Sequence, residues 1–186
     1  MGCNFSLSKS DMEEAKLEKR ILMLGLDNAG KTSLMYRIKD NTFVETVPTV
    51  GLNMESSTYK HFHLTIWDVA GKARNMWKHY FEENAAVGFV MDSTDDAWLV
   101  IAKMELKNLL NETILKDIPF LVFLNKQDAS AMQWITEDDI LKDATIEPLL
   151  VGRQVFIQKC SAKTGEGVWE GIDKLVEAMD QAETKR

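Results

Sequence analysis

Short apolar runs alternate with longer amphipathic segments along most of the chain. The apolar runs predict strands over residues 21–24, 52–59, 61–68, 87–92, 119–124 and 154–158. The amphipathic segments predict helices over residues 32–39, 97–115, 137–143 and 168–181. Alternating strands and helices with nearly continuous apolar strands are typical of an α/β fold, in which helices cover both faces of a mostly parallel sheet. We therefore predict a six-stranded sheet of this kind.

Residues 25–32 read Gly-Leu-Asp-Asn-Ala-Gly-Lys-Thr and fit the pattern GxxxxGK[ST]. They lie between a predicted strand and a predicted helix, which is the context that a phosphate-binding loop requires. Gly25 and Gly30 would let backbone N–H groups approach an oligophosphate, and Lys31 would reach its terminal phosphates. The Thr32 hydroxyl would bind Mg²⁺. A glycine turn without a ligand is the alternative. The predicted nucleotide contacts in this stretch are Asp27, Asn28, Ala29, Gly30, Lys31, Thr32 and Ser33.

Two further polar segments, each after a predicted strand, indicate which base the site reads. Asp128 ends the segment Asn-Lys-Gln-Asp, and its carboxylate can accept hydrogen bonds from both N1–H and the exocyclic amine of guanine. Adenine would leave that carboxylate unpaired, which is a strong basis for discrimination. The N–H of Ala162 is placed to donate to guanine O6. The predicted base contacts are Asn125, Lys126, Asp128, Ser161, Ala162 and Lys163.

The segment Asp-Val-Ala-Gly at residues 68–71 reads DxxG at the end of another predicted strand. Asp68 would hold Mg²⁺ through water, and the Gly71 N–H would sense a γ-phosphate. Thr49, which follows Pro48, is the candidate for a second hydroxyl on the metal. The predicted magnesium set is therefore Thr32, Thr49 and Asp68.

These motifs, in this order and spacing, resemble a small GTPase of the Ras superfamily with the P-loop NTPase fold. Residues 25–27, 48–53, 67–69 and 77–81, together with Gly2, are similar to the ADP-ribosylation factor (Arf) and Arf-like branch. The resemblance covers essentially the whole chain. A nucleotide kinase or an ATPase shares the phosphate loop, but it has no use for the two base-reading segments.

The resemblance implies a GTP/GDP-dependent switch with bound Mg²⁺ that recruits effectors, with a role in membrane trafficking. It places Thr49 in switch I and residues 68–81 in switch II, and it implies an exchange factor, a GTPase-activating protein and effectors as partners. An apolar effector surface would be formed by Leu52, Trp67 and Tyr80. Strand alternation independently puts Trp67 on the face opposite Phe62, although packing under a neighbouring loop is the alternative.

Lys72 is a departure from the family, which usually has glutamine at this position. Glutamine can accept a hydrogen bond from the attacking water, whereas an ammonium group has three donors and no acceptor. Lys72 could still stabilise negative charge on the phosphate. With Gly71 and Thr49, it is the candidate catalytic set, and we predict a GTP hydrolase with slow intrinsic activity. A non-hydrolysing guanine-nucleotide-binding scaffold is the alternative. The segment from Asp68 to Trp77 is also shorter than the family pattern.

The net charge of −7 argues against nucleic acid as a partner, because binding to phosphate backbones needs a basic surface. Cys3 and Cys160 do not form a disulfide framework, which is typical of a reducing compartment. His61 and His63 could suggest a metal pair, but nothing near them in the sequence completes a ligand set. We expect a cytoplasmic monomer that associates peripherally with membranes.

The N-terminal sequence Met-Gly-Cys-Asn-Phe-Ser matches the myristoylation pattern MGxxx[ST]. Gly2 would accept myristate, and Cys3 could accept palmitate, which would turn weak membrane binding into stable anchoring. Residues 10–20 favour a helix with few apolar positions. We therefore expect a lipid-anchor extension over residues 1–19 and a guanine-nucleotide-binding domain over residues 20–186.

Overall fold

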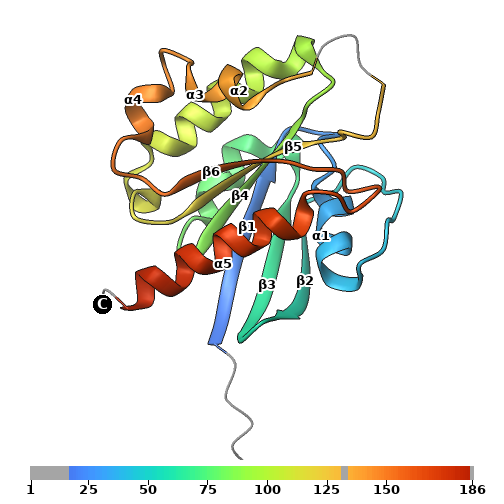
Figure 1. Ribbon diagram of the computed structural model, residues 1–186, viewed down its shortest axis with the longest axis vertical. Coiled ribbons are helices and arrows are strands. Elements are labelled where there is room, and N and C mark those ends of the chain that lie inside the picture. Colours follow the sequence, from blue (N-terminus) through green and yellow to red (C-terminus); the bar gives the residue numbers. More distant parts are fainter. Residues whose placement is uncertain (1–16, 131–133, 185–186) are drawn as a thin grey trace, which may run out of the picture.

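Six strands form one sheet in the computed structural model, which describes residues 17–130 and 134–184. The strands are β1 (Leu17–Gly25), β2 (Leu52–Tyr59), β3 (Phe62–Val69), β4 (Ala86–Asp92), β5 (Phe120–Asn125) and β6 (Val155–Lys159). Their order across the sheet is β2-β3-β1-β4-β5-β6, and every neighbouring pair except β2 and β3 is parallel. The predicted α/β class and the mostly parallel six-stranded sheet are confirmed (Figure 1).

The helices are α1 (Lys31–Asp40), α2 (Asp96–Asn111), α3 (Glu137–Leu141), α4 (Glu147–Leu150) and α5 (Val168–Thr184), with 3₁₀ segments η1 (Gly71–Tyr80) and η2 (Thr113–Leu115). The predicted helix over residues 97–115 is two segments, because Glu112 between them has extended backbone angles. The sequence did not predict η1 or α4. Trp77 is the one side chain that η1 buries, and a single buried side chain leaves no helical period to detect.

Two hydrophobic clusters cover the two faces of the sheet. One contains Ile21 and Met23 of β1 and is covered by α1 and α5. The other contains Leu22 and Leu24 of the same strand and is covered by α2 and η1. Figure 1 shows α5 crossing the sheet, with α1 beside it. The buried strand therefore needs apolar residues at every position, which explains the continuous run in the sequence.

The strand β1 begins earlier than expected, at Leu17, so the prediction of a helix over residues 10–20 is wrong for residues 17–20. These residues pair in parallel with Phe62–Thr65 of β3. A neighbouring strand satisfies their backbone groups, and this overrides the local preference for helix. The remainder of the predicted extension, including Gly2 and Cys3, lies outside the described residues. Within the part of the chain that the structure describes, no helix is long and apolar enough to cross a membrane.

The carboxyl ends of the parallel strands bring four distant segments to one edge of the sheet. The predicted phosphate loop follows β1, Asp68 lies at the end of β3, Asn125 ends β5, and Ser161 comes shortly after β6. In open α/β sheets this edge is where ligands bind. The fold therefore gathers every internal motif of the sequence at one place.

Candidate nucleotide-binding site

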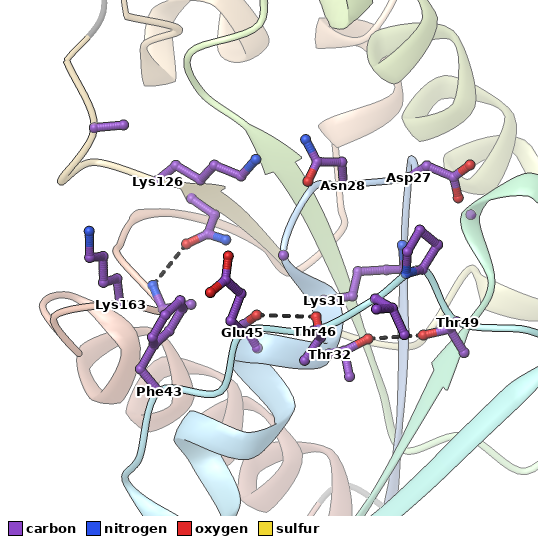
Figure 2. Close-up of a pocket in the computed structure, with 18 of the residues that line it drawn as sticks. Asp27, Asn28, Lys31, Thr32, Phe43, Glu45, Thr46, Thr49, Lys126 and Lys163 are labelled. Carbon is purple, nitrogen blue, oxygen red and sulfur yellow. Dashed lines mark hydrogen bonds between the residues drawn. The ribbon is translucent and has the colours of Figure 1, made fainter.

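A cavity of about 320 Å³ opens at this edge of the sheet. Figure 2 shows its lining side chains, with Phe43, Lys126 and Lys163 on one side of the view and Asp27, Lys31 and Thr49 on the other. Its lining residues are Asp27, Asn28, Gly30, Lys31, Thr32, Ser33, Phe43, Glu45, Thr46, Val47, Pro48, Thr49, Gly71, Asn125, Lys126, Asp128, Ala129, Ala162 and Lys163. Most of the predicted phosphate and base contacts thus line opposite ends of a single cavity.

Two of the predicted nucleotide contacts lie behind the cavity wall. The Ala29 carbonyl accepts a hydrogen bond from Asn125 Nδ2 at 2.8 Å. The Ser161 hydroxyl donates to Asp128 Oδ1 at 2.5 Å. Both residues therefore orient neighbours that do line the cavity.

The phosphate end is built around the turn between β1 and α1. Gly30 has φ of 91°, and a Cβ atom there would lie 2.3 Å from Asn125 Nδ2, so only glycine fits this close approach. Lys31 is buried, and its Nζ donates to the Leu26 carbonyl at 2.9 Å. Burial lowers the pKa of Lys31, although Asp68 and Asp27 act in the opposite direction. An anion beside this ammonium group would be strongly stabilised.

Thr32, Thr49 and Asp68 meet next to Lys31, as predicted for a magnesium site. The two hydroxyl oxygens lie 3.0 Å apart, and both hydroxyls donate to Asp68 Oδ2, from Thr49 at 3.1 Å. Asp68 is fully buried, and burial raises its pKa against the opposing effects of Thr32, Lys31 and Thr49. Its Oδ1 atom is buried without a hydrogen-bond partner among the described residues. Two hydroxyls and a carboxylate with a free oxygen fit a hydrated Mg²⁺ ion, which prefers oxygen ligands.

At the base end of the cavity, Asn125 connects the phosphate loop to the loop that follows β6. The Ala162 N–H, which was predicted to donate to guanine O6, donates to Asn125 Oδ1 at 2.9 Å in this structure. Asp128 Oδ2 lies 4.0 Å from Lys163 Nζ, and the Lys126 ammonium pairs with Asp92 at 2.7 Å. The side chain of Asp128, which lines the cavity, is thus held by the Ser161 hydroxyl and lies near the positive charge of Lys163. Such an arrangement can recognise a base that offers two adjacent N–H donors.

Lys72 does not line the cavity. Its side chain is 82% exposed, and its Nζ lies 3.9 Å from Asp27 Oδ2. Gly71 is packed against the phosphate loop, since a Cβ atom there would lie 2.5 Å from the Asp27 nitrogen. The backbone of the DxxG motif therefore reaches the site, whereas the side chain that follows it points to solvent.

Sequence reasoning missed the loop over residues 43–47, which forms one wall of the cavity. Phe43 lies at the base end, and the carboxylate of Glu45 lies between the two ends (Figure 2). Ser33 on α1 holds this loop by donating to the Val44 carbonyl at 3.0 Å. No motif marks these residues in the sequence. The one available signal was their position between α1 and Thr49, because any chain joining the two must pass the phosphate end.

The three residues of the predicted effector surface are partly buried and lie together beside η1. The rings of Trp67 and Tyr80 meet edge to face with centroids 6.1 Å apart, and the Arg20 guanidinium lies 4.2 Å from the Trp67 ring centroid. Met54 pairs with Trp67 across the strands and is 53% exposed. Leu52 lies on the same face as Met54. We call these four apolar residues, Leu52, Met54, Trp67 and Tyr80, the interstrand patch.

The two histidines do not belong to a metal site within the described residues, where no cluster of three or more histidine, cysteine or acidic groups is present. His61 contacts Asp180 at 2.8 Å, and His63 lies 3.4 Å from the Thr58 hydroxyl. Cys160 is buried, and burial raises the pKa of its thiol, so it is not a reactive nucleophile.

Comparison with known proteins gives one consistent result. The sequence profile of the ADP-ribosylation factor family matches residues 5–179. ADP-ribosylation factor J of Dictyostelium discoideum is 41% identical over 169 residues, which is 90% of this chain and 88% of that protein. The Arl6 BBS3 small GTPase from Trypanosoma brucei, solved with the bound nucleotide analogue GppNp, superposes with a TM-score of 0.79 at 29% identity, covering 89% of this chain and 99% of that one.

A phosphate loop, a DxxG segment and two base-reading loops thus line one cavity in a chain whose profile match spans nearly its whole length. The chain belongs to the ADP-ribosylation factor family of small GTPases, which bind GTP or GDP with Mg²⁺ and hydrolyse GTP.

Proposed function

We propose that this GTPase is a membrane-associated switch that recruits effector proteins in its GTP form, with a role in membrane trafficking. The proposal rests on the connection between the cavity and the interstrand patch through β2 and β3. Thr49 lies just before β2 and Gly71 just after β3, and both line the cavity. Because β2 and β3 are antiparallel and Leu52 pairs with Val69, nucleotide contacts at these two residues would act on the same, open end of the strand pair that displays Trp67.

In the proposed complex, the phosphates occupy the end of the cavity with Lys31 and Gly30, and guanine occupies the end with Asp128 and Ala162. The remaining proposed nucleotide contacts that line the cavity are Asp27, Asn28, Thr32, Ser33, Thr49, Gly71, Asn125, Lys126 and Lys163. Ala29 and Ser161 would act from behind its wall, by holding Asn125 and Asp128. Lys31 is the buried cation among them, so it would neutralise charge on the terminal phosphates.

Thr32, Thr49 and, through water, Asp68 are proposed to hold Mg²⁺. When bound, the ion would neutralise charge on the phosphate oxygens. The unpartnered Asp68 Oδ1 supports this assignment, because a buried carboxylate oxygen is costly to leave without a partner. The hydroxyls of Thr32 and Thr49 contact the other carboxylate oxygen. Thr49 belongs to a loop without regular structure, so this loop could approach or leave the ion.

The interstrand patch is the proposed effector surface. Trp67 lies near its centre, and we expect Trp67→Ala to abolish most GTP-dependent partner binding. Tryptophans that become buried at the centre of an interface contribute at least ~2 kcal/mol to the binding free energy, which is roughly 30-fold in affinity. Quantitative mass spectrometry of lysate proteins retained on GTP-loaded and GDP-loaded protein measures this loss. Trp98→Ala is the matched control, since Trp98 is 51% exposed on α2. Equal retention by wild type and Trp67→Ala would rule out the patch as the contact surface.

Membrane association is proposed to depend on myristate at Gly2, with palmitate at Cys3 as a second anchor. We expect Gly2→Ala to lose most binding to phospholipid vesicles after co-expression with a myristoyltransferase, because one acyl chain supplies an association constant of about 10⁴ M⁻¹. Intact mass and vesicle sedimentation are the measurements. Cys3→Ser should retain the myristate and the weak vesicle binding that it gives. Sedimentation of Gly2→Ala at the wild-type level would contradict lipid anchoring.

Hydrolysis is proposed to be intrinsically slow, because Lys72 offers no acceptor for the attacking water. Its exposure supports this proposal, because the side chain points to solvent and its ion pair with Asp27 is long, at 3.9 Å. The state of the switch would then be set mainly by nucleotide exchange and by an activating protein.

A further inference from the structure

Arg37, on the helix that follows the phosphate loop, reaches the base-reading loop with its guanidinium group. The residue is 9% exposed. Its Nε donates to the Ala162 carbonyl at 3.0 Å, and one terminal nitrogen donates to the Lys163 carbonyl at 2.5 Å. The other terminal nitrogen donates to the Asn41 carbonyl at 2.7 Å. One planar group therefore fixes three backbone carbonyls from two separate loops.

These contacts hold the Ala162 residue from both sides. Its carbonyl is bound by Arg37, and its N–H is bound by Asn125. The loop also closes tightly on itself, with Gly165 N–H donating to the Ser161 carbonyl at 2.8 Å. Gly165 lies against the Arg37 side chain, where an added Cβ would be 3.6 Å from Cδ. The direction in which the Ala162 N–H points is thus set partly by a residue outside the cavity.

The same side chain joins the helix that follows the phosphate loop to the base-reading loop. Arg37 lies six positions after Lys31 on one continuous helix, which corresponds to a rise of about 9 Å. The Asn41 carbonyl that it binds belongs to the helix cap, at the start of the loop that carries Phe43 to the cavity. Arg37 therefore ties the phosphate loop helix, the base-reading loop and the switch I loop together.

We infer that Arg37 is a positioning residue that sets guanine affinity and selectivity by holding the base-reading loop at the cavity, so that the Ala162 N–H, which donates to Asn125 Oδ1 in this structure, is within reach of position 6 of a bound guanine. The inference rests on the proposed placement of guanine beside Asp128 and Ala162. A guanidinium group suits this task because its rigid fork of donors can satisfy several carbonyls at once. A lysine ammonium is a single point and cannot reach all three.

The test measures release of fluorescent GDP and relative binding of GDP and 6-thio-GDP to the full chain. The sulfur of 6-thio-GDP accepts hydrogen bonds weakly, but the base keeps both donors that would face Asp128. We expect Arg37→Met to release GDP roughly 10-fold faster, because a net loss of one charge-assisted hydrogen bond has about that effect. Its preference for GDP over 6-thio-GDP should shrink toward unity. Arg37→Lys should fall between Arg37→Met and wild type in both measurements.

Arg153→Met is the matched control. Arg153 also donates from both terminal nitrogens to backbone carbonyls, those of Leu115 and Leu110 at 2.9 and 2.6 Å, but it lies away from the cavity. We expect this variant to lose thermal stability while keeping wild-type GDP release and base preference. If Arg37 only stabilised the fold, Arg37→Met would behave in the same way, with lower thermal stability but wild-type GDP release and base preference.

The outcomes separate this inference from the proposed nucleotide site. Suppose that wild type prefers GDP to ADP, and that the Arg37 variants keep the wild-type rate of GDP release and the wild-type preference for GDP over 6-thio-GDP. This result overturns the inference and leaves the proposed nucleotide site intact. Wild type without a preference for GDP over ADP overturns both. Where Arg37→Met does not fold, the Arg37→Lys variant decides by the same two measurements.

Discussion

Replacing Asp128 by asparagine is expected to lower GDP affinity by at least about 10³-fold, because the amide presents donors to a base edge that also carries donors. Asp128 is held in place by the Ser161 hydroxyl, 2.5 Å from its Oδ1, so the substituted side chain should keep the same position. Xanthosine diphosphate has an oxygen at position 2, and its affinity should rise in the variant. Displacement of a fluorescent guanine nucleotide, repeated with both diphosphates, measures the two changes.

The control for this substitution is Asp138→Asn on α3. Asp138 forms an exposed pair with Lys142, the residue that caps the end of α3, and it does not line the cavity. An exposed pair contributes little, so the control should match wild type in stability and in nucleotide binding. Unchanged GDP affinity in Asp128→Asn would mean that another group reads the base, and the proposed orientation of the nucleotide would then be wrong.

Replacing Lys72 by glutamine is expected to accelerate single-turnover hydrolysis of bound GTP by about 10- to 100-fold, because a hydrogen-bond acceptor that orients the attacking water contributes on this order. In the structure the Lys72 side chain is exposed and faces Asp27, so the substitution removes only a weak surface pair. The fold and nucleotide affinity should be unaffected. Phosphate release from protein pre-loaded with GTP gives the rate directly.

Lys72→Met separates the two properties that lysine brings to this position. Methionine removes the positive charge but supplies no effective acceptor, so we expect Lys72→Met to remain as slow as wild type. A fast Lys72→Met would show that the charge itself inhibits hydrolysis. Lys72→Gln no faster than wild type would refute the argument that a missing acceptor limits the rate, and Lys72 would then stabilise the phosphate charge in some other way.

The parts of the site that could be predicted are those whose chemistry lies within a few consecutive residues. Gly30, Lys31 and Thr32 act through one turn and one helix start, so their spacing carries their role. Asp68 ends a predicted strand and Asp128 lies shortly after another, and parallel strands place such ends at one edge. The alternation along β3 likewise predicted that Phe62 is buried and that Trp67 is not fully buried.

The residues that could not be predicted act through partners far away in the chain. Arg37 reads as an ordinary basic residue near a helix end, yet its carbonyl partners Ala162 and Lys163 are more than a hundred positions later. Phe43 and Glu45 line the cavity only because α1 directs the following loop back across the phosphate end. Leu17 lies in a strand because β3 is available beside it.

The sequence by itself determined the class of fold, the phosphate loop and the base that the site should read, because periodicity and short motifs record interactions between near neighbours. The tertiary structure alone decided that Lys72 faces solvent, that Asp68 keeps one buried oxygen without a partner among the described residues, and that Arg37 joins the helix after the phosphate loop to the base-reading loop. These features depend on which distant segments the sheet brings together. Burial and hydrogen bonding between such segments leave no pattern in the local order of residues.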